Sequence, residues 1–322
     1  MYAHTLEYFK ILRSILQSTL ASSVHFSGFG LHSGLPVTLV IHPADIGHGL
    51  QIKRTDVASG NDAFSALWTC VSQSPLCTRL VNADGMAVST IEHVMAALAG
   101  CGVHNALLEL DGPEAPILDG SAVPFVEKML AAGVTAQNVP VTVFKVKKTV
   151  EFRNDTGWAR LAPADTLQIE FHIDFEDAAI GVQSKSLNLS NGAFVRELCD
   201  SRTFCRQADV DYMHANGLAL GGSLANAVVV DGETVLTPGG LRHRDEAVRH
   251  KMLDALGDLA LAGAPIVGHY TGFCAGHAIT NNLLRELFTT PGAVEKIECT
   301  PEMVACLPGV GVTKYEIPKS AE

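Results

Sequence analysis

The stretch "VRHKMLDALGDL", Val248 to Leu259, places an imidazole and two carboxylates in an otherwise helical, largely apolar pattern. On a helix of 3.6 residues per turn, His250, Asp254 and Asp258 are spaced four apart and share one face. Two ligands four apart on a helix can hold one metal ion, and a His with an Asp forms an N/O pair that Zn²⁺ accepts. Catalytic zinc usually has three protein ligands. The stretch therefore predicts a metal site that needs one more ligand from elsewhere in the chain.

A second polar pair interrupts the apolar stretch "STIEHVMAALAG". Ser89 or Thr90 is a natural N-cap and Gly100 a natural C-cap, so we predict a helix between them. An unpaired carboxylate buried there costs several kcal/mol or takes a raised pKa. The alternative is a solvent-facing edge, but the apolar and alanine neighbours leave little polar face. We therefore interpret His93 as the missing metal ligand and Glu92 as the base that activates water.

A third candidate is His277 in "AGHAITNN", which follows Gly276 at the start of a predicted helix. A single His is more often structural than catalytic, and the chain contains 13 of them. Its position between a predicted strand and a helix favours a role in the site, because catalytic residues often lie on such connections.

The composition describes a folded chain with excess negative charge. Its 322 residues are 47% hydrophobic and 18% charged, with a net charge of −11. A general nucleic-acid binder needs a basic face to neutralise phosphates, so we expect no nucleic-acid partner. A small phosphorylated ligand stays compatible with this charge, because a local Lys or Arg cluster can bind it.

Cysteine spacing and hydropathy bear on the compartment. The eight Cys are scattered and form no CxxC pair, which argues against a zinc ribbon or a thioredoxin motif. This scatter suits a reducing compartment, and no run of about 18 uncharged apolar residues marks a membrane span. We therefore expect a cytoplasmic protein.

The order of strand and helix patterns predicts two α+β domains that join near residues 138–143. We place the N-terminal domain at residues 18–140 and the C-terminal domain at residues 141–316. Residues 1–17 show apolar residues at helical spacing, two cations and no cleavage site. They predict a short amphipathic extension helix rather than a signal peptide.

Two glycine-rich stretches, "GFGLHSG" and "GLALGGS", need a separate interpretation. Neither leads from a strand into a helix, as a phosphate-binding loop does, so dinucleotide binding has little support. We interpret both as tight turns. The motifs GxxxxGK[ST] and GxSxG are absent from the sequence.

Several long motifs occur in one order along the chain. They are "GFGLHSG", "LCTRLVN", "STIEHVMAALAG", "PEAPILDGSAVPFV", "SRTF", "GLALGGS", "LRHRDEAVRHKMLDALGD" and "GHAITNN". Through them, the segment from about Ser18 to Leu287 closely resembles the UDP-3-O-acyl-N-acetylglucosamine deacetylases, zinc enzymes of lipid A synthesis. The resemblance implies two similar α+β domains, each with a mixed or antiparallel sheet packed on a helix pair, and an active site at their interface.

The resemblance also implies roles for the polar residues of the three stretches. His93, His250 and Asp254 match the zinc ligands of the family. Glu92 matches its general base, and His277 its general acid. These assignments account for the shared face of the 248–259 helix, because that face would line a reaction centre.

Further residues match positions that support catalysis or contact substrate. Asp258 would orient and charge-stabilise the catalytic imidazolium, and Thr203 would hold the oxyanion. Phe204 and Lys251 would contact substrate, with the Lys251 cation facing the anionic part of the ligand. The segment from about 205 to 223 would form a passage for the acyl chain.

The other implied substrate contacts lie in two of the quoted motifs. They are Leu76 and Cys77 of "LCTRLVN" and Gly222 of "GLALGGS".

The chain departs from the usual family pattern at a few positions. His243 and Ala247 replace the usual Phe residues, Ala225 replaces an Asp, and Cys205 replaces a Gly. None of these positions belongs to the metal or acid/base set. They affect the expected shape of the acyl passage and hence the acyl length that is preferred.

Three functions stay open from the sequence. The leading one is zinc-dependent removal of acetate from UDP-3-O-acyl-N-acetylglucosamine. The alternatives are a zinc deacetylase of another N-acyl amino sugar and a catalytically silent protein that binds a sugar nucleotide. For the leading function we expect a monomer with a UDP-linked small-molecule substrate and a transient contact with the inner-membrane surface.

Overall fold

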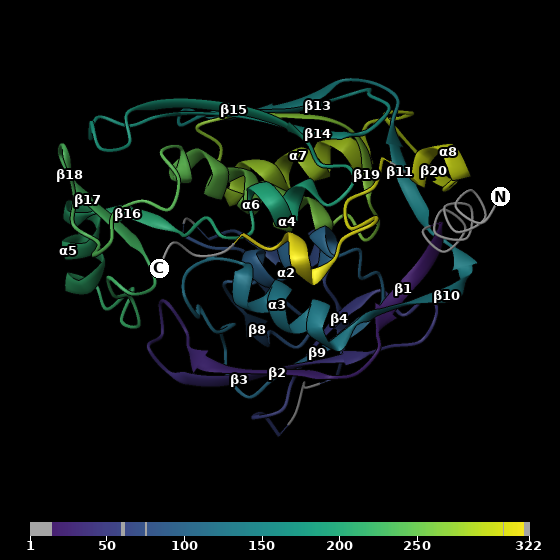
Figure 1. The fold of residues 1–322 in the computed structure, drawn as a ribbon, viewed down its shortest axis with the longest axis horizontal. Coiled ribbons are helices and arrows are strands. Elements are labelled where there is room, and N and C mark those ends of the chain that lie inside the picture. The colour runs from purple at the N-terminus through teal and green to yellow at the C-terminus, as the bar shows by residue number, and fades with distance from the viewer. Residues whose placement is uncertain (1–14, 59–61, 75, 305, 319–322) are drawn as a thin grey trace.

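The computed structural model describes residues 15–58, 62–74, 76–304 and 306–318, and its secondary structure forms four layers. Two β-sheets form the outer layers, and two layers of helices lie between them (Figure 1). The mixed helix and strand content confirms the predicted α+β class.

The first sheet comes from the N-terminal part of the chain and has five strands in the order β2-β3-β9-β4-β5. Its strands are β2 (Val24–Phe29), β3 (Pro36–Pro43), β4 (Leu50–Arg54), β5 (Phe64–Ser65) and β9 (Ala106–Leu110). Residues 37, 39 and 41 of β3 are buried and their neighbours are more exposed, as the alternation in the sequence predicts. Helices α2 (Glu92–Gly100) and α3 (Val123–Ala132) cover its inner face.

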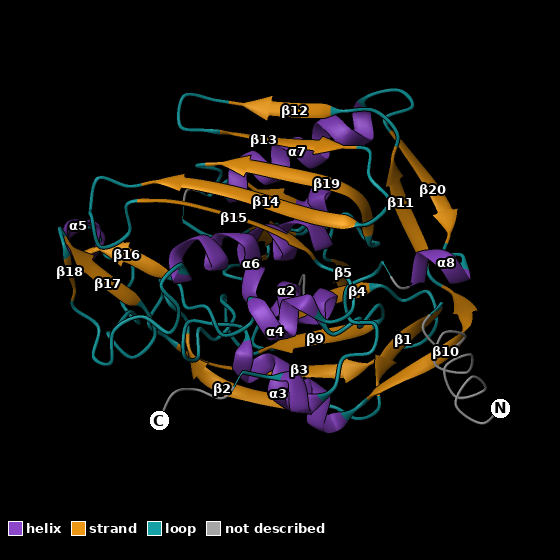
Figure 2. Ribbon diagram, turned by 45° about the horizontal axis from the view of Figure 1, so that its top comes forward, coloured by secondary structure: helices purple, strands orange, loops and turns teal. Residues whose placement is uncertain are grey.

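The second sheet has seven strands, with the order β12-β13-β19-β11-β20 along its main path. Its strands are β11 (Thr142–Val146), β12 (Val150–Arg153), β13 (Trp158–Ala162), β14 (Leu167–Asp174), β15 (Val182–Asn188), β19 (Ile266–Phe273) and β20 (Val294–Glu298). Strand β14 joins through parallel pairing with β19, and β15 pairs with β14. Helices α6 (Glu246–Ala260) and α7 (His277–Thr289) pack on its inner face (Figure 2).

Smaller elements connect or flank these layers. Strands β1 (Leu16–Leu20) and β10 (Val134–Pro140) form a two-stranded sheet. A three-stranded sheet contains β6 (Val71–Ser72), β7 (Arg79–Val81) and β8 (Ala87–Val88). A second three-stranded sheet contains β16 (Phe204–Arg206), β17 (Val228–Asp231) and β18 (Thr234–Val235). The remaining helices are η1 (Trp68–Cys70), α4 (Ala193–Glu197), α5 (Gln207–Ala215), α8 (Pro301–Val304) and η2 (Lys314–Glu316).

The predicted domain boundary falls between β10 and β11. The five-stranded sheet uses residues before 140 and the seven-stranded sheet uses residues after 141, which supports a division there. The exact division into 18–140 and 141–316 stays a prediction.

The predicted extension helix over 1–17 lies mostly outside the described residues, which begin at residue 15. At its end the prediction is wrong, because Leu16 and Gln17 belong to β1. This strand pairs antiparallel with β10, so a partner more than 100 residues away decides its conformation.

The predicted N-cap of the 89–100 helix is also wrong. Helix α2 begins at Glu92, and no side chain caps it. Thr90 instead has a φ of 57° and donates its hydroxyl to Glu114 Oε1 at 2.7 Å. An N-cap residue has its φ and ψ in the β region, so the positive φ of Thr90 removes it from the N-cap geometry.

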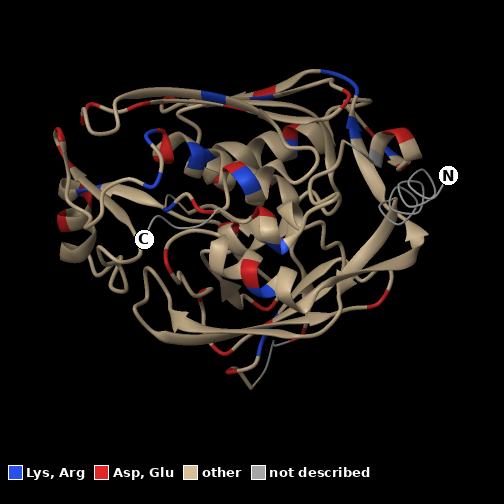
Figure 3. Cartoon of the chain, in the orientation of Figure 1, with Lys and Arg blue, Asp and Glu red and all other residues tan. Residues whose placement is uncertain are grey.

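Charged residues of both signs are dispersed over the strands and loops at the periphery (Figure 3). A few ionisable side chains are buried between the helix layers, among them Glu92, Asp254 and Asp258. None of the helices in the described part of the chain combines the length and apolar character that a membrane crossing requires.

Helices α2 and α6 touch backbone to backbone at Gly257. A Cβ atom added to Gly257 would lie 2.1 Å from the carbonyl oxygen of Glu92 and 3.2 Å from the backbone nitrogen of Ala96. Both are backbone atoms, so no side-chain rotation could relieve the contact. A glycine at this position therefore permits the two helix layers to approach closely.

We predict that Gly257→Ala lowers the free energy of unfolding by about 1–3 kcal/mol, because the added methyl group overpacks the helix contact. Chemical denaturation of the purified variant measures this loss. Gly276→Ala is the control for the added methyl group, because a Cβ there meets nothing within 4 Å and its φ is negative. Gly276 is the N-cap residue of α7, so this control should lose no more than about 1 kcal/mol. Equal unfolding free energies for Gly257→Ala and wild type would contradict the proposed tight contact.

Candidate active site

The three predicted metal ligands lie together between the helix layers. His93 comes from the first turn of α2, and His250 and Asp254 come from consecutive turns of α6. Their ligand atoms all lie within 4.8 Å of one another, and all three residues are buried. The two imidazole rings meet edge to face, with centroids 5.0 Å apart.

One atom of this cluster lacks the partner that a buried polar atom needs. Asp254 Oδ1 is buried and has no hydrogen-bond partner among the described residues. It lies 3.3 Å from Nε2 of His250 and 3.7 Å from Nε2 of His93. Two imidazole nitrogens and an unpartnered carboxylate oxygen that converge on one point fit a divalent cation such as Zn²⁺.

Hydrogen bonds to neighbouring groups orient these three side chains. His250 Nδ1 lies 2.9 Å from the carbonyl oxygen of Ser201, so Nδ1 carries the proton and Nε2 keeps its lone pair for a metal. Lys251 Nζ lies 2.6 Å from Asp254 Oδ2, the carboxylate oxygen that faces away from the two imidazoles. Lys251, predicted to contact substrate, thus also holds a predicted metal ligand.

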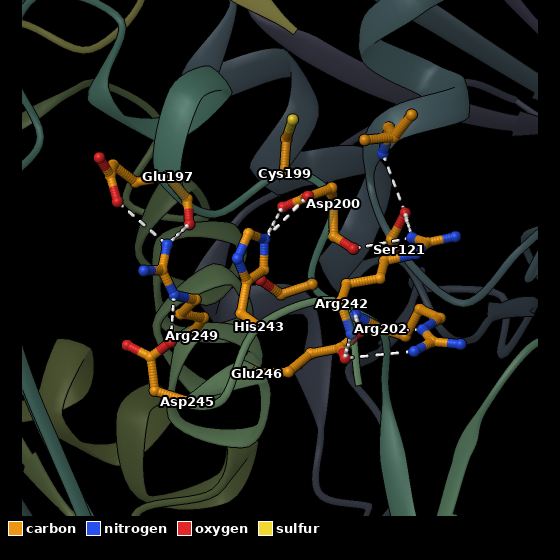
Figure 4. A network of polar contacts seen from close by, with 12 residues as sticks. Ser121, Glu197, Cys199, Asp200, Arg202, Arg242, His243, Asp245, Glu246 and Arg249 are labelled. Atoms are coloured by element: carbon orange, nitrogen blue, oxygen red, sulfur yellow. Dashed lines mark hydrogen bonds and ion pairs between the residues drawn. The ribbon is translucent and has the colours of Figure 1, made fainter. Parts of the chain in front are cut away.

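A network of ion pairs, with the buried Arg202–Glu246 pair among them, holds the loop on either side of Ser201, at Asp200 and Arg202 (Figure 4). Glu246, 1% exposed, accepts hydrogen bonds from the backbone and guanidinium N–H groups of Arg202 and from the backbone N–H of Arg242. Because Glu246 and His250 lie one turn apart on α6, the loop is attached to this helix at two points. The network also contains the pair between His243 and Asp200, at 2.8 Å.

Beside the predicted metal ligands His93, His250 and Asp254, which we call the metal cluster, Glu92 and His277 form a pair of their own. Their closest atoms, Glu92 Oε1 and His277 Nε2, are 3.7 Å apart. His277 Nδ1 donates to Asp258 Oδ2 at 2.9 Å. Thr78 joins both acids, because its backbone N–H donates to Glu92 Oε2 at 3.0 Å and its hydroxyl donates to Asp258 Oδ1.

The environment raises the pKa of both Glu92 and His277, for different reasons. Burial raises the pKa of Glu92 to about 7, against the effect of His277. Burial alone would lower the pKa of His277, but the carboxylates of Asp258 and Glu92 outweigh it and raise the value to about 9. Near neutral pH, Glu92 can therefore accept a proton while His277 can donate one.

The metal cluster has the ionisation states that cation binding requires. Burial and the neighbouring His250 lower the pKa of His93 to about 3, so its ring is neutral at pH 7. Burial opposes the ionisation of Asp254, but His250 and Lys251 nevertheless hold its pKa well below the usual range. Neutral imidazoles and an ionised carboxylate are the forms that bind metal.

The predicted substrate contacts and the predicted oxyanion donor Thr203 differ in their burial and in their contacts. The Phe204 ring meets the His250 ring edge to face at 6.3 Å, and the neighbouring Thr203 hydroxyl has no hydrogen-bond partner among the described residues. Cys77 is buried, and burial together with Glu92 raises the pKa of its thiol to about 11. Leu76 is 40% exposed.

The two glycine-rich turns pack against each other. Gly221 donates its N–H to the carbonyl oxygen of Leu31 at 2.9 Å, and a Cβ on Gly221 would lie 2.2 Å from the carbonyl oxygen of Gly30. Gly222, a predicted substrate contact, lies in this junction, where an added Cβ would be 3.6 Å from Leu31. The sequence predicts each turn but not their mutual packing.

Sequence reasoning missed three residues near the site. Thr78 and Glu246 act through hydrogen bonds to segments far away in the chain, so no local pattern marks them. His32 lies in "GFGLHSG", and both of its ring nitrogens are buried without a partner in the described part of the chain. Burial lowers its pKa, and its charge interacts with that of His277. Its position in a tight turn between Gly30 and Gly34 is the sequence feature that could have pointed to His32.

Comparison with known proteins assigns the chain to a family. The model of the family "UDP-3-O-acyl N-acetylglycosamine deacetylase" matches residues 17–289. A UDP-3-O-acyl-N-acetylglucosamine deacetylase of Shewanella violacea is 43% identical over 293 residues, which cover 90% of this chain and 95% of the relative. The enzyme of the same name from Histophilus somni is 44% identical over 283 residues, 87% of this chain and 92% of the relative. The chain therefore belongs to the UDP-3-O-acyl N-acetylglycosamine deacetylase family.

Proposed function

We propose that this protein removes acetate from UDP-3-O-acyl-N-acetylglucosamine by zinc-dependent amide hydrolysis, in the synthesis of lipid A. The observation that supports this most directly is the unpartnered Asp254 Oδ1 between His93 and His250, next to the Glu92–His277 pair. A protein that only binds a sugar nucleotide would need neither a base with a raised pKa nor an acid beside it.

His93, His250 and Asp254 would hold the zinc ion. Bound there, zinc would polarise the acetamide carbonyl and lower the pKa of the attacking water towards about 7. The fit rests on the donor set and on the buried oxygen that lacks a partner. Lys251 limits the cost of the buried carboxylate by binding its other oxygen.

The remaining steps use side chains of this chain. Glu92, while ionised, takes a proton from the attacking water. Thr203 donates its hydroxyl to the oxyanion that develops on the acetamide carbonyl. His277, protonated and oriented by Asp258, gives its proton to the departing amine, which leaves acetate and a free amino sugar.

Exposed apolar side chains in and next to the segment 205–223 support the proposal that the substrate carries an acyl chain. Leu218 and Leu220 in this segment and Leu224 next to it are 36–58% exposed, although apolar. A substrate that carries an acyl chain could cover such side chains. We place the reaction in the cytoplasm, carried out by a monomer that meets the inner membrane only transiently.

Metal content and turnover together test the metal site. We expect His250→Ala to lose both the zinc and the deacetylation of UDP-3-O-acyl-N-acetylglucosamine. Glu92→Gln keeps the zinc but turns over at least about 10²-fold more slowly, because only the base is lost. His42→Ala, on the outer sheet, is the control with normal metal and rate. Full activity of Glu92→Gln, or of metal-free enzyme, would rule out the mechanism.

The pH dependence tests the acid and the base. The base works only when ionised, so the rate falls as pH drops below the pKa of Glu92, about 7. The acid works only when protonated, so the rate falls as pH rises through the pKa of His277, about 9. The expected profile of kcat/KM is a bell.

Asp258→Asn should move the alkaline limb of that bell to lower pH, because it removes a carboxylate that raises the pKa of His277. The metal content should stay normal. An alkaline limb at the wild-type pH in Asp258→Asn, or a flat rate from about pH 5 to 9, would contradict the assignment of His277 as the acid.

Removing the 3-O-acyl chain from the substrate separates the proposed reaction from deacetylation of another amino sugar. We expect kcat/KM to fall at least about 10²-fold, since each buried methylene contributes up to about 0.8 kcal/mol. The comparison uses the same enzyme with acylated and unacylated UDP-N-acetylglucosamine. Equal kcat/KM values would favour the alternative substrate.

A further inference from the structure

A cavity of about 260 Å³ lies at the end of the α2–α6 helix pair that is opposite to the metal cluster. The predicted metal ligands lie in the first turn of α2 and at positions 250 and 254 of α6, whereas Ala99, Leu259 and Ala260, at the C-terminal ends of the same helices, line the cavity. Asp258, directly before Leu259, does not line it and bonds to His277 instead. None of the residues given a catalytic or substrate role above lines it.

Both halves of the chain contribute walls, and most of these walls are apolar. Leu50 and Leu67 come from the N-terminal half, and Leu256, Pro265 and Ile266 come from the C-terminal half. The last carbonyls of both helices are already occupied, for example Ala99 by the N–H of Gly102 and Ala260 by the N–H of Gly263. The helix ends therefore offer few free acceptors to a ligand.

The charge of the cavity is unusual for this chain. Among the residues that line it, the one that carries a formal charge at pH 7 is Lys296, although the whole chain has 34 acidic and 23 basic residues. Lys296 is exposed, and within the described residues it has no ion-pair partner; its Nζ lies 6.0 Å from the Phe144 ring centroid. The lining also includes the uncharged polar residues Gln17, Ser65, Asn105 and Thr142. A cavity with mostly apolar walls, these polar groups and a single cation is complementary to an amphipathic anion.

His104 supplies a second donor. Its Nδ1 accepts the backbone N–H of Ser18 at 3.1 Å, while the Ser18 hydroxyl donates to the carbonyl oxygen of Gly102. The ring proton therefore sits on Nε2, which has no partner in the described part of the chain. Burial lowers the pKa of His104 to about 4, so the ring is a neutral N–H donor at pH 7.

We propose that this cavity binds a medium-chain aliphatic carboxylate, with the carboxylate at Lys296 and His104 and the chain along the apolar walls. The size of the cavity sets the length. A cavity of about 150 Å³ holds a benzene ring, so about 260 Å³ accommodates about ten non-hydrogen atoms, as in an eight-carbon carboxylate. Such a ligand would touch both halves of the chain and hold them together.

Calorimetric titration of the full, zinc-loaded protein with octanoate tests the proposal. We expect one site, weakened about 1.4- to fivefold by Lys296→Gln, the range for one exposed ion pair. Lys147→Gln is the matched control, because Lys147 is an exposed cation that pairs with Glu295 and does not line the cavity. Octan-1-ol should bind more weakly than octanoate and be insensitive to Lys296→Gln. Equal binding of acid and alcohol would overturn the proposal.

A cavity-filling variant tests the location. Ala260→Leu adds three carbons inside the cavity and should abolish octanoate binding while the deacetylase activity stays. If this variant fails to fold, nuclear Overhauser effects from octanoate to the methyl groups of Leu256 and Leu259 in the wild-type protein make the same test. An octanoate signal that survives Ala260→Leu and disappears with excess UDP-linked acylated sugar would assign the binding to the catalytic site and overturn the proposal.

Discussion

The close contact between α2 and α6 is the constraint on which the site depends. At Gly257 the second helix touches the carbonyl oxygen of Glu92, with no room for a Cβ. This approach brings His93 to within 4.8 Å of ligand atoms that lie 157 and 161 positions later in the chain. A side chain at 257 would separate the two helices, and the metal cluster would lose its geometry before any ligand itself was changed.

The contact also creates an electrostatic problem, because it buries several ionisable groups together. Such groups are tolerated only when each has a partner. Most of them do: Asp258 binds His277 and Thr78, and Lys251 binds one oxygen of Asp254. The other oxygen of Asp254, Oδ1, has no hydrogen-bond partner among the described residues. The same arrangement raises the pKa of both Glu92, to about 7, and His277, to about 9, so that between these values one buried cluster contains both a base and an acid.

Local patterns predicted much of the fold and most of the polar residues of the cluster. The four-residue spacing of His250 and Asp254 follows from helix geometry alone, and the pair at 92–93 was conspicuous among apolar neighbours. Long-range contacts decided what the patterns missed. Thr90 has a positive φ, does not cap α2 and donates its hydroxyl to a carboxylate 24 positions away, and Leu16 belongs to a strand that pairs with β10. No spacing rule shows that Gly257 faces another helix.

The division of the cluster between α2 and α6 has a consequence for synthesis. A ribosome finishes the α2 donor more than 150 residues before the two donors of α6, so a partly made chain holds only His93 of this predicted donor set. Cation binding at the proposed site would therefore follow the docking of the two helix layers. A hydrolytic centre assembled this late would stay inert throughout most of translation.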